Sequence, residues 1–233
     1  SFLGDKSAQS RLRYELRKDC PYSNEELAPF FSVSARLGSD PDQADVVRRV
    51  LSQSVTIVQG PPGTGKTQAI ANMVSCIEGL AKGAGGDTPT VAIVSTNKEA
   101  VLNALDEVRA IRRAGDREGE HALADRCMYL GNKQIREQFI RSLSNQEIEK
   151  YGFASRSDEQ KKQNRIPRKA LSRWPVFGST LHSLYRCFCD GLGDSKMFDY
   201  VIVDEGSQVP LYLGLIDLRH ARHLVVLGDV RQI

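Results

Sequence analysis

The fold of this chain is decided by Gly60-Pro61-Pro62-Gly63-Thr64-Gly65-Lys66-Thr67, which matches the pattern G-x-x-x-x-G-K-S/T. Its glycines let backbone N–H groups curl around phosphates, and the helix expected to begin at Lys66 adds its positive end. Lys66 is predicted to neutralise the β- and γ-phosphates of a nucleotide, and Thr67 to place its hydroxyl on Mg²⁺. The alternative, a plain glycine-rich turn, is disfavoured because a strand runs in and a helix runs out, as phosphate binding requires.

Short apolar strands and amphipathic helices alternate on both sides of this loop. Strands are predicted at Val55–Val58, Val91–Val94, Cys127–Leu130, Val176–Ser179, Tyr200–Val203 and Leu224–Leu227. Helices are predicted at Gln9–Lys18, from Pro41, from Lys66, at Asn97–Ile111 and at Lys133–Leu143. This alternation predicts an α/β fold, a doubly wound parallel sheet covered on both faces.

Composition excludes several classes of protein. The 233 residues are 40% hydrophobic and 26% charged, which is typical of a globular protein rather than a disordered, collagen-like or coiled-coil chain. The five cysteines are scattered, which favours a reducing, intracellular setting, cytoplasmic or, in a eukaryote, nuclear. Because the chain begins with Ser1 and stops abruptly at Ile233, we expect a piece of a longer protein.

Positive charge is concentrated in the middle of the chain. Arg109 to Arg173 contains 16 lysines and arginines against nine aspartates and glutamates. This basic middle is a candidate contact for a polyanion, and the alternative is a solvated pair of charged helices. Its densest cluster is Lys161, Lys162, Arg165, Arg168 and Lys169. The stretch Ser155–Lys169 has almost no apolar residues, which predicts a mobile insert.

A pair of acids follows the predicted strand at Tyr200–Val203. Carboxylates at the carboxyl end of a central strand lie where open α/β sheets bind ligands. We therefore predict that Asp204 holds Mg²⁺ through water and that Glu205 acts as a general base on the attacking water. A solvated strand end is the alternative, and the phosphate loop in the same chain argues against it.

Two segments resemble a known family. Asp204-Glu205-Gly206-Ser207-Gln208 resembles motif II, and Gly228-Asp229-Val230-Arg231-Gln232 resembles motif III, of superfamily 1 helicases. The phosphate loop resembles that of superfamily 1B, the branch containing the nonsense-decay helicase and senataxin. Gly206 stands where the family usually has alanine, which we interpret as a minor change.

Shorter segments resemble other motifs of the same branch. Asp42-Gln43 is similar to the Q motif, in which Gln43 would read the adenine edge, and Gln208 would link the nucleotide to the rest of the motor. Gln232 would sense the γ-phosphate. By the same resemblance, the residues that would contact phosphates of a single strand are Ser95, Thr96, Asn97 and Thr180. Helix capping is the alternative for these four residues.

The resemblance implies an ATP-binding, RecA-like P-loop domain at residues 40–233. A flanking segment at 1–39 precedes it, a basic and partly helical insertion occupies about 112–174, and a second motor domain lies outside the chain. The implied activity is ATP hydrolysis with Mg²⁺, with Lys66, Asp204, Glu205 and Gln232 as catalytic residues, coupled to 5′ to 3′ movement along single-stranded RNA or DNA. A nucleic-acid-binding ATPase that acts as a scaffold without unwinding stays open as the alternative.

Overall fold

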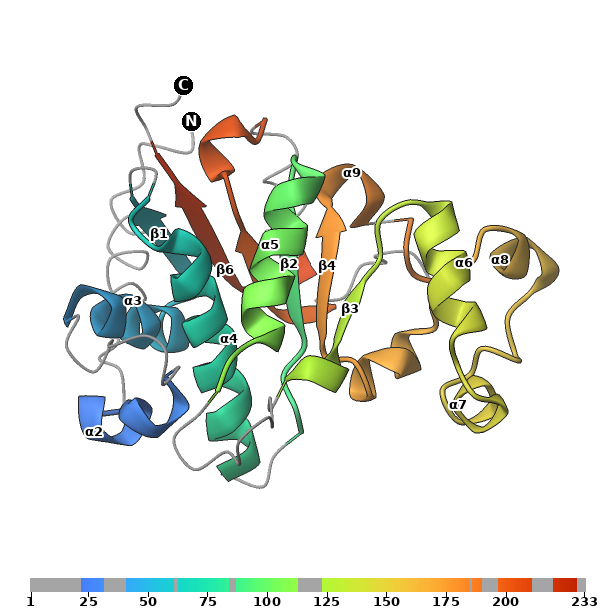
Figure 1. The fold of residues 1–233 in the computed structure, drawn as a ribbon, viewed down its shortest axis with the longest axis horizontal. Coiled ribbons are helices and arrows are strands. Elements are labelled where there is room, and N and C mark those ends of the chain that lie inside the picture. The colour runs from blue at the N-terminus through green and yellow to red at the C-terminus, as the bar shows by residue number, and fades with distance from the viewer. Residues whose placement is uncertain are drawn as a thin grey trace, which may run out of the picture.

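The computed structural model describes residues 22–31, 41–60, 63–83, 87–112, 123–184, 186–189, 197–210 and 220–229. Within this part of the chain, six parallel strands form one sheet in the order β1-β6-β5-β2-β4-β3 (Figure 1). The strands are β1 (Val55–Gln59), β2 (Val91–Ser95), β3 (Cys127–Tyr129), β4 (Val176–Thr180), β5 (Phe198–Val203) and β6 (Ala221–Gly228). All six predicted strands are therefore present, with bounds that differ by a few residues.

Helices connect these strands. The α-helices are α2 (Asn24–Leu27), α3 (Pro41–Ser52), α4 (Lys66–Gly83), α5 (Lys98–Arg109), α6 (Lys133–Arg141), α7 (Asn145–Lys150), α8 (Asp158–Lys162) and α9 (Leu181–Leu184). The 3-10 helices are η1 (Ala28–Phe30), η3 (Ala124–Arg126), η4 (Arg168–Ser172) and η5 (Gly206–Gln208). The helix predicted at Gln9–Lys18 lies outside the described residues. None of the helices among those described is long and apolar enough to cross a membrane.

Both faces of the sheet are buried at β2, which explains why this strand is a continuous apolar run, whereas Ile57 on the edge strand β1 is 79% exposed. Successive strand residues point to opposite faces, so Val91 and Ile93 pack with α4 and α5, whereas Ala92 and Val94 pack with the segment between β3 and β4. Figure 1 shows α4 and α5 in front of the sheet. The predicted doubly wound α/β fold is confirmed.

The segment between β3 and β4, residues 130–175, overlaps the insertion predicted at about 112–174 and is called the insertion below; β3 itself belongs to the sheet. Its helices start at side-chain caps: Asn132 caps α6, and Ser144 and Ser157 form capping boxes at α7 and α8. Trp174 is buried between the Phe139 and Tyr151 rings, at 5.1 and 5.4 Å between ring centroids. The insertion is therefore ordered, and its helices α6, α7 and α8 lie beyond the β3 edge of the sheet (Figure 1).

The prediction of a mobile insert at Ser155–Lys169 is wrong. Ile166 is fully buried, its N–H donates to the Cys187 carbonyl at 2.7 Å, and its carbonyl accepts the Cys189 N–H at 2.9 Å. The buried Ile166 side chain and a short parallel bridge between Ile166 and Phe188 anchor this stretch. The bridge lies between α8 and η4, so the residues on both sides of it are helical. Hydrogen bonding of the main chain replaces the apolar burial that the composition lacks.

Candidate nucleotide-binding site

The phosphate loop joins β1 to α4. Gly63 and Gly65 have φ values of 80° and 76°, in the left-handed region that glycine adopts without strain. The loop begins beside β6, because the Gly60 N–H donates to the Gly228 carbonyl at 3.1 Å. Pro61 and Pro62 lie outside the described residues, and Thr64 is exposed. Gly63 and Gly65 thus have the backbone conformation of a glycine-rich turn after the prolines, and Gly60 is held at β6 before them.

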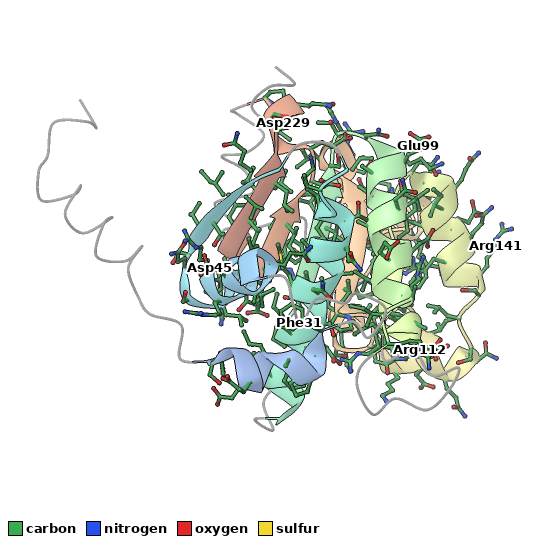
Figure 2. The ribbon with its side chains drawn as sticks, turned by 60° about the vertical axis from the view of Figure 1, so that its left-hand side comes forward. Phe31, Asp45, Glu99, Arg112, Arg141 and Asp229 are labelled. Carbon is green, nitrogen blue, oxygen red and sulfur yellow. The ribbon has the colours of Figure 1, made fainter. Side chains whose placement is uncertain are left out.

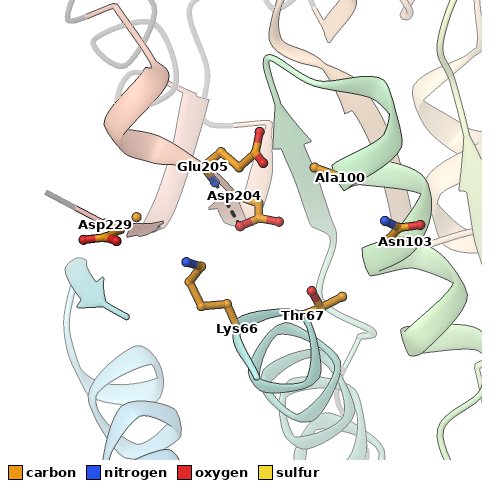
Figure 3. A pocket seen from close by; sticks show the side chains of 8 residues that line it. Lys66, Thr67, Ala100, Asn103, Asp204, Glu205 and Asp229 are labelled. Carbon is orange, nitrogen blue, oxygen red and sulfur yellow. Dashed lines mark hydrogen bonds between the residues drawn. The ribbon is translucent and has the colours of Figure 1, made fainter. Parts of the chain in front are cut away.

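Lys66 and Thr67, the first two residues of α4, line a pocket of about 230 Å³. The Lys66 ammonium donates to the Gly60 carbonyl at 2.7 Å, so the side chain lies along the loop. Facing it across the pocket are the ends of β5 and β6 and one face of α5 (Figure 3), and the lining residues are Lys66, Thr67, Ala100, Asn103, Asp204, Glu205, Gly228 and Asp229. The structure therefore brings the two predicted halves of the site together.

Asp204 follows the last residue of β5 and is only 6% exposed. Its N–H donates to the Val94 carbonyl at 2.8 Å, which ties it to β2, and its carboxylate accepts the Glu205 N–H at 2.9 Å. Burial raises the pKa of Asp204 above its ordinary value, while that N–H and the charge of Lys66 act in the opposite direction. Asp204 is thus a partly desolvated acid beside a lysine.

Glu205 has an unusual backbone for a residue with a side chain, with φ 54° and ψ 38°. Such a conformation costs about 1–3 kcal/mol and persists only where the surroundings impose it, often at functional sites. Burial, and then the neighbouring Asp204 carboxylate, raise the pKa of Glu205, and Lys66 opposes them. Within the described residues, its buried Oε2 atom has no hydrogen-bond partner. Figure 3 shows the Glu205 carboxyl turned away from Lys66 and Thr67.

Other predicted site residues lie at different distances from the pocket. The Gln208 N–H donates to the Glu205 carbonyl at 2.9 Å, but its side chain is exposed and does not line the pocket. Gln232 lies outside the described residues. Gln43 on α3 reaches the phosphate loop: a Cβ atom on Gly65 would be 3.5 Å from its Nε2 atom, and its Oε1 atom accepts from Asn72 at 3.5 Å.

Four lining residues carried no assignment from the sequence, and one of them, Gly228, is the last residue of β6. Asp229 is 4% exposed and stands at the end of β6, inside the segment that resembles motif III. Ala100 and Asn103 come from α5: Asn103 lies opposite the buried residues Val101 and Leu105, whereas Ala100 lies one turn before the buried Ala104. The helical spacing of the apolar residues predicts which face of α5 is buried and which is polar. It does not show that residues outside the buried face line a pocket.

Comparison with known proteins identifies the family. A family model described as an AAA domain matches residues 38–150 and 93–233. The chain belongs to this AAA-domain family. Over 207 residues it is 25% identical to the ATP-dependent helicase upf1 of Schizosaccharomyces pombe, covering 82% of this chain and 21% of that protein. Over 218 residues it is 26% identical to Regulator of nonsense transcripts 1 of Dictyostelium discoideum, covering 82% of this chain and 15% of that protein.

A solved structure extends the comparison to the fold. The UvsW helicase from Bacteriophage T4 matches 91% of this chain and 61% of its own, with a TM-score of 0.53 and 12% identity. The AAA-family chain spans about a fifth or less of the curated relatives above. The resemblance to superfamily 1 helicases and the RecA-like fold are confirmed. The chain is a helicase-family P-loop ATPase domain, which implies ATP binding.

The four predicted nucleic-acid contacts gather at one edge of this AAA-family domain. Ser95 and Thr180 are partners in the β2–β4 register, so their strands end side by side. Ser95 is fully buried and its hydroxyl accepts the Asn97 N–H at 3.2 Å. Asn97 in turn caps α5 through the Glu99 N–H at 2.9 Å. Ser95 and Asn97 therefore have local structural roles, and contact with a strand stays a prediction for all four, including Thr96.

The pocket and these residues share one end of the molecule. Figure 2 shows Asp229, which follows β6, and Glu99, at the start of α5, at the same end. Parallel strands place all their carboxyl ends on one edge of a sheet, and open α/β sheets bind ligands there. The geometry therefore allows one surface to serve both a nucleotide and a second ligand.

Basic residues of the insertion have two different environments. Arg136, 6% exposed, donates to the Gly131 carbonyl at 2.9 Å and the Gln163 carbonyl at 3.3 Å. Arg156 donates to the Phe153 and Arg165 carbonyls, and Arg173 to the Asp125 carbonyl. In the densest cluster, Lys161, Lys162 and Lys169 are exposed, and Arg165 and Arg168 are half-buried.

Proposed function

We propose that this domain is the ATP-binding motor of a nucleic-acid helicase, which hydrolyses ATP to move 5′ to 3′ along single-stranded RNA or DNA. One observation carries the proposal: Lys66 and Thr67 on α4 share a pocket with Asp204 and Glu205 at the end of β5. The motor domain would extend over 40–233 with its insertion, after a flanking segment at 1–39, and a second motor domain would come from the rest of the complete protein.

Four side chains of the pocket, Lys66, Thr67, Asp204 and Glu205, have a part in ATP hydrolysis under this proposal. Lys66 binds the β- and γ-phosphates, and its bond to the Gly60 carbonyl is exchanged for them. Thr67 and Asp204 offer a hydroxyl and a carboxylate, oxygen ligands that fit Mg²⁺, and they would hold the ion. When bound, the ion would neutralise charge that develops on the phosphates.

Glu205 would act as the general base. Its raised pKa makes it a stronger base than an ordinary glutamate, and its buried Oε2 atom has no hydrogen-bond partner among the described residues. Gln232 would sense the γ-phosphate, Gln43 would read adenine, and Gln208 would relay the state of the nucleotide to the rest of the motor. These three roles follow from the resemblance and are part of the proposal.

Calorimetry of ATP binding tests the pocket directly. Replacing Lys66 with alanine should remove most of the affinity for Mg·ATP, because the ammonium charge is what the phosphates meet. Lys150→Ala is the matched control, since Lys150 is an exposed lysine on α7 and does not line the pocket. Equal affinities for wild type and Lys66→Ala would end the assignment of this pocket to ATP.

Translocation tests the second half of the proposal. The complete protein should hydrolyse ATP faster with single strands present and should displace a paired strand. ATP turnover without movement along any strand would instead support an ATP-regulated scaffold.

A further inference from the structure

The turn that carries Glu205 packs tightly against β6. A Cβ atom added to Gly206 would overlap Val226 Cγ1 and lie 3.2 Å from the Leu227 carbonyl oxygen. A Cβ atom added to Gly228 would lie 2.9 Å from the Ser207 nitrogen. Real Cβ atoms essentially never come closer than 3.0 Å to such neighbours. The two backbones therefore approach to a distance that only glycine permits at these positions.

We propose that Gly206 and Val226 form a matched pair that positions the Glu205 carboxylate for the reaction. This inference rests on the proposed function, in which Glu205 is the general base. Glu205 directly precedes Gly206, and η5 begins at Gly206. Any shift of η5 away from β6 therefore changes the backbone angles of Glu205 first.

The local hydrogen bonds do not hold Glu205 by themselves. They join residues within the turn: the Gln208 N–H donates to the Glu205 carbonyl at 2.9 Å, and the Val209 N–H to the Gly206 carbonyl at 3.1 Å. These bonds would survive a rigid movement of the whole turn. The Asp204 N–H ties the start of the turn to β2, and the contact of Gly206 with Val226 fixes the rest of the turn against β6, and hence the left-handed backbone of Glu205 relative to the pocket.

The Val226 side chain cannot rotate away from an added methyl group as a long, flexible side chain could. It is β-branched, so its χ1 angle is restricted, and the added methyl group is confined on its other side by the Leu227 main chain. Alanine at position 206 therefore displaces the turn rather than its neighbour. Under this proposal Gly206 is more than a minor change from the family's usual alanine, because in this chain Val226 occupies the space that the methyl group needs.

A double-mutant experiment on the complete protein tests the pair. Gly206→Ala should lower kcat for strand-stimulated ATP hydrolysis by about 10²-fold, as expected for a catalytic group misplaced by about 1 Å. The Kd for Mg·ATP should stay within about twofold, because the phosphate loop belongs to other elements. Val226→Ala alone should also lower kcat, because it removes the contact that fixes the turn, and Gly206→Ala combined with Val226→Ala should have a kcat at least about tenfold above that of Gly206→Ala.

A matched glycine provides the control. Gly79 lies in the last turns of α4, where an added Cβ would overlap the Phe30 ring, and it does not line the pocket. Gly79→Ala should shift Tm and leave kcat unchanged below Tm, which separates positioning from loss of stability. Wild-type kcat in Gly206→Ala, or no recovery in the double variant, would overturn the matched pair. If Glu205→Gln retains wild-type turnover, the role of Glu205 fails, and this result is distinct from a failure of the pair.

Discussion

The nucleotide pocket and the insertion use charged side chains in opposite ways. In the pocket, Lys66, Asp204 and Glu205 stand at the ends of separate elements and line a common cavity. In the insertion, Arg136 and Arg156 donate to carbonyls of their own segment and hold its helices together. The first arrangement leaves charge available to a ligand, and the second uses it within the fold.

This difference shows that the number of charged residues in a segment does not identify a binding site, whereas the phosphate-loop motif does indicate where a charged side chain meets a ligand. The excess of lysine and arginine over Arg109–Arg173 suggests one binding surface, yet its arginines at 136, 156 and 173 have main-chain partners. The loop at 60–67 contains a single lysine, and the fold places that lysine in the pocket. Position relative to strand ends, rather than the amount of charge, distinguishes the two regions.

The largest effect is expected at Glu205. Glu205→Gln should abolish turnover in the complete protein but change little in the 233-residue chain, whose hydrolysis we expect to be very slow. The reason is that an arginine finger, worth about 10³–10⁵ in rate in other P-loop enzymes, would come from a second motor domain. Single-turnover assays on both proteins measure this. Fast hydrolysis by the 233-residue chain, lost in Glu205→Gln, would show that the chain needs no second domain.

The next effect concerns the structural arginines of the insertion. Arg136→Met should destabilise the protein by about 3 kcal/mol, because it leaves two carbonyl oxygens in a partly buried site without their charged donor. Arg141→Met is the matched control on the same helix, since its side chain is 77% exposed and pairs only with Glu137 among the contacts described. That change should stay within about 0.5 kcal/mol.

Chemical denaturation of both arginine variants gives the two values. Similar losses for Arg136→Met and Arg141→Met would mean that the buried and the exposed arginines of α6 do not differ in function. The conclusion that the insertion uses its buried arginines to hold the fold together, unlike the pocket, would then lose its main support.

A smaller effect is expected from the exposed part of the insertion. Replacing Lys161, Lys162, Arg165, Arg168 and Lys169 with glutamine should weaken binding to every single strand alike. It should also make the plot of log K against log salt shallower by about 0.7 for each lost phosphate contact. A salt titration against one unstructured oligonucleotide measures both. Unchanged curves would assign this charge to solubility.

The smallest effect is expected at a helix cap. Ser144→Ala should cost about 1 kcal/mol, because the Ser144 hydroxyl accepts the Glu147 N–H and the Glu147 carboxylate accepts the Ser144 N–H at 3.0 Å. Thermal unfolding should show this loss with ATP affinity unchanged. A change in ATP affinity would indicate that the insertion and the pocket are coupled.

The sequence predicts the fold and the two halves of the pocket because both depend on local patterns. The loop at 60–67 lies between a β-branched run and an amphipathic helix, and Asp204 directly follows an apolar strand. Contacts between distant segments were not predictable. Ile166 is ordered by pairing with Cys187 and Cys189, and the Glu205 backbone depends on Val226 in another strand. Such contacts follow from the tertiary fold and leave no periodic signal.

The position of β6 in the sheet determines when the domain can complete its fold during synthesis. β6 lies between β1 and β5, pairing Leu224 with Val55 on one side and Val201 on the other. β1, which leads into the phosphate loop, and β5, which precedes Asp204, therefore do not pair with each other. β6 must pair with both strands before the two halves of the pocket come together. Because β6 is the last of the six described strands in sequence order, residues 55–228 must all leave the ribosome before the pocket can close. Nascent chains remain unable to hold a nucleotide in this pocket until that late step, and pairing of residues so distant in sequence makes the step slow.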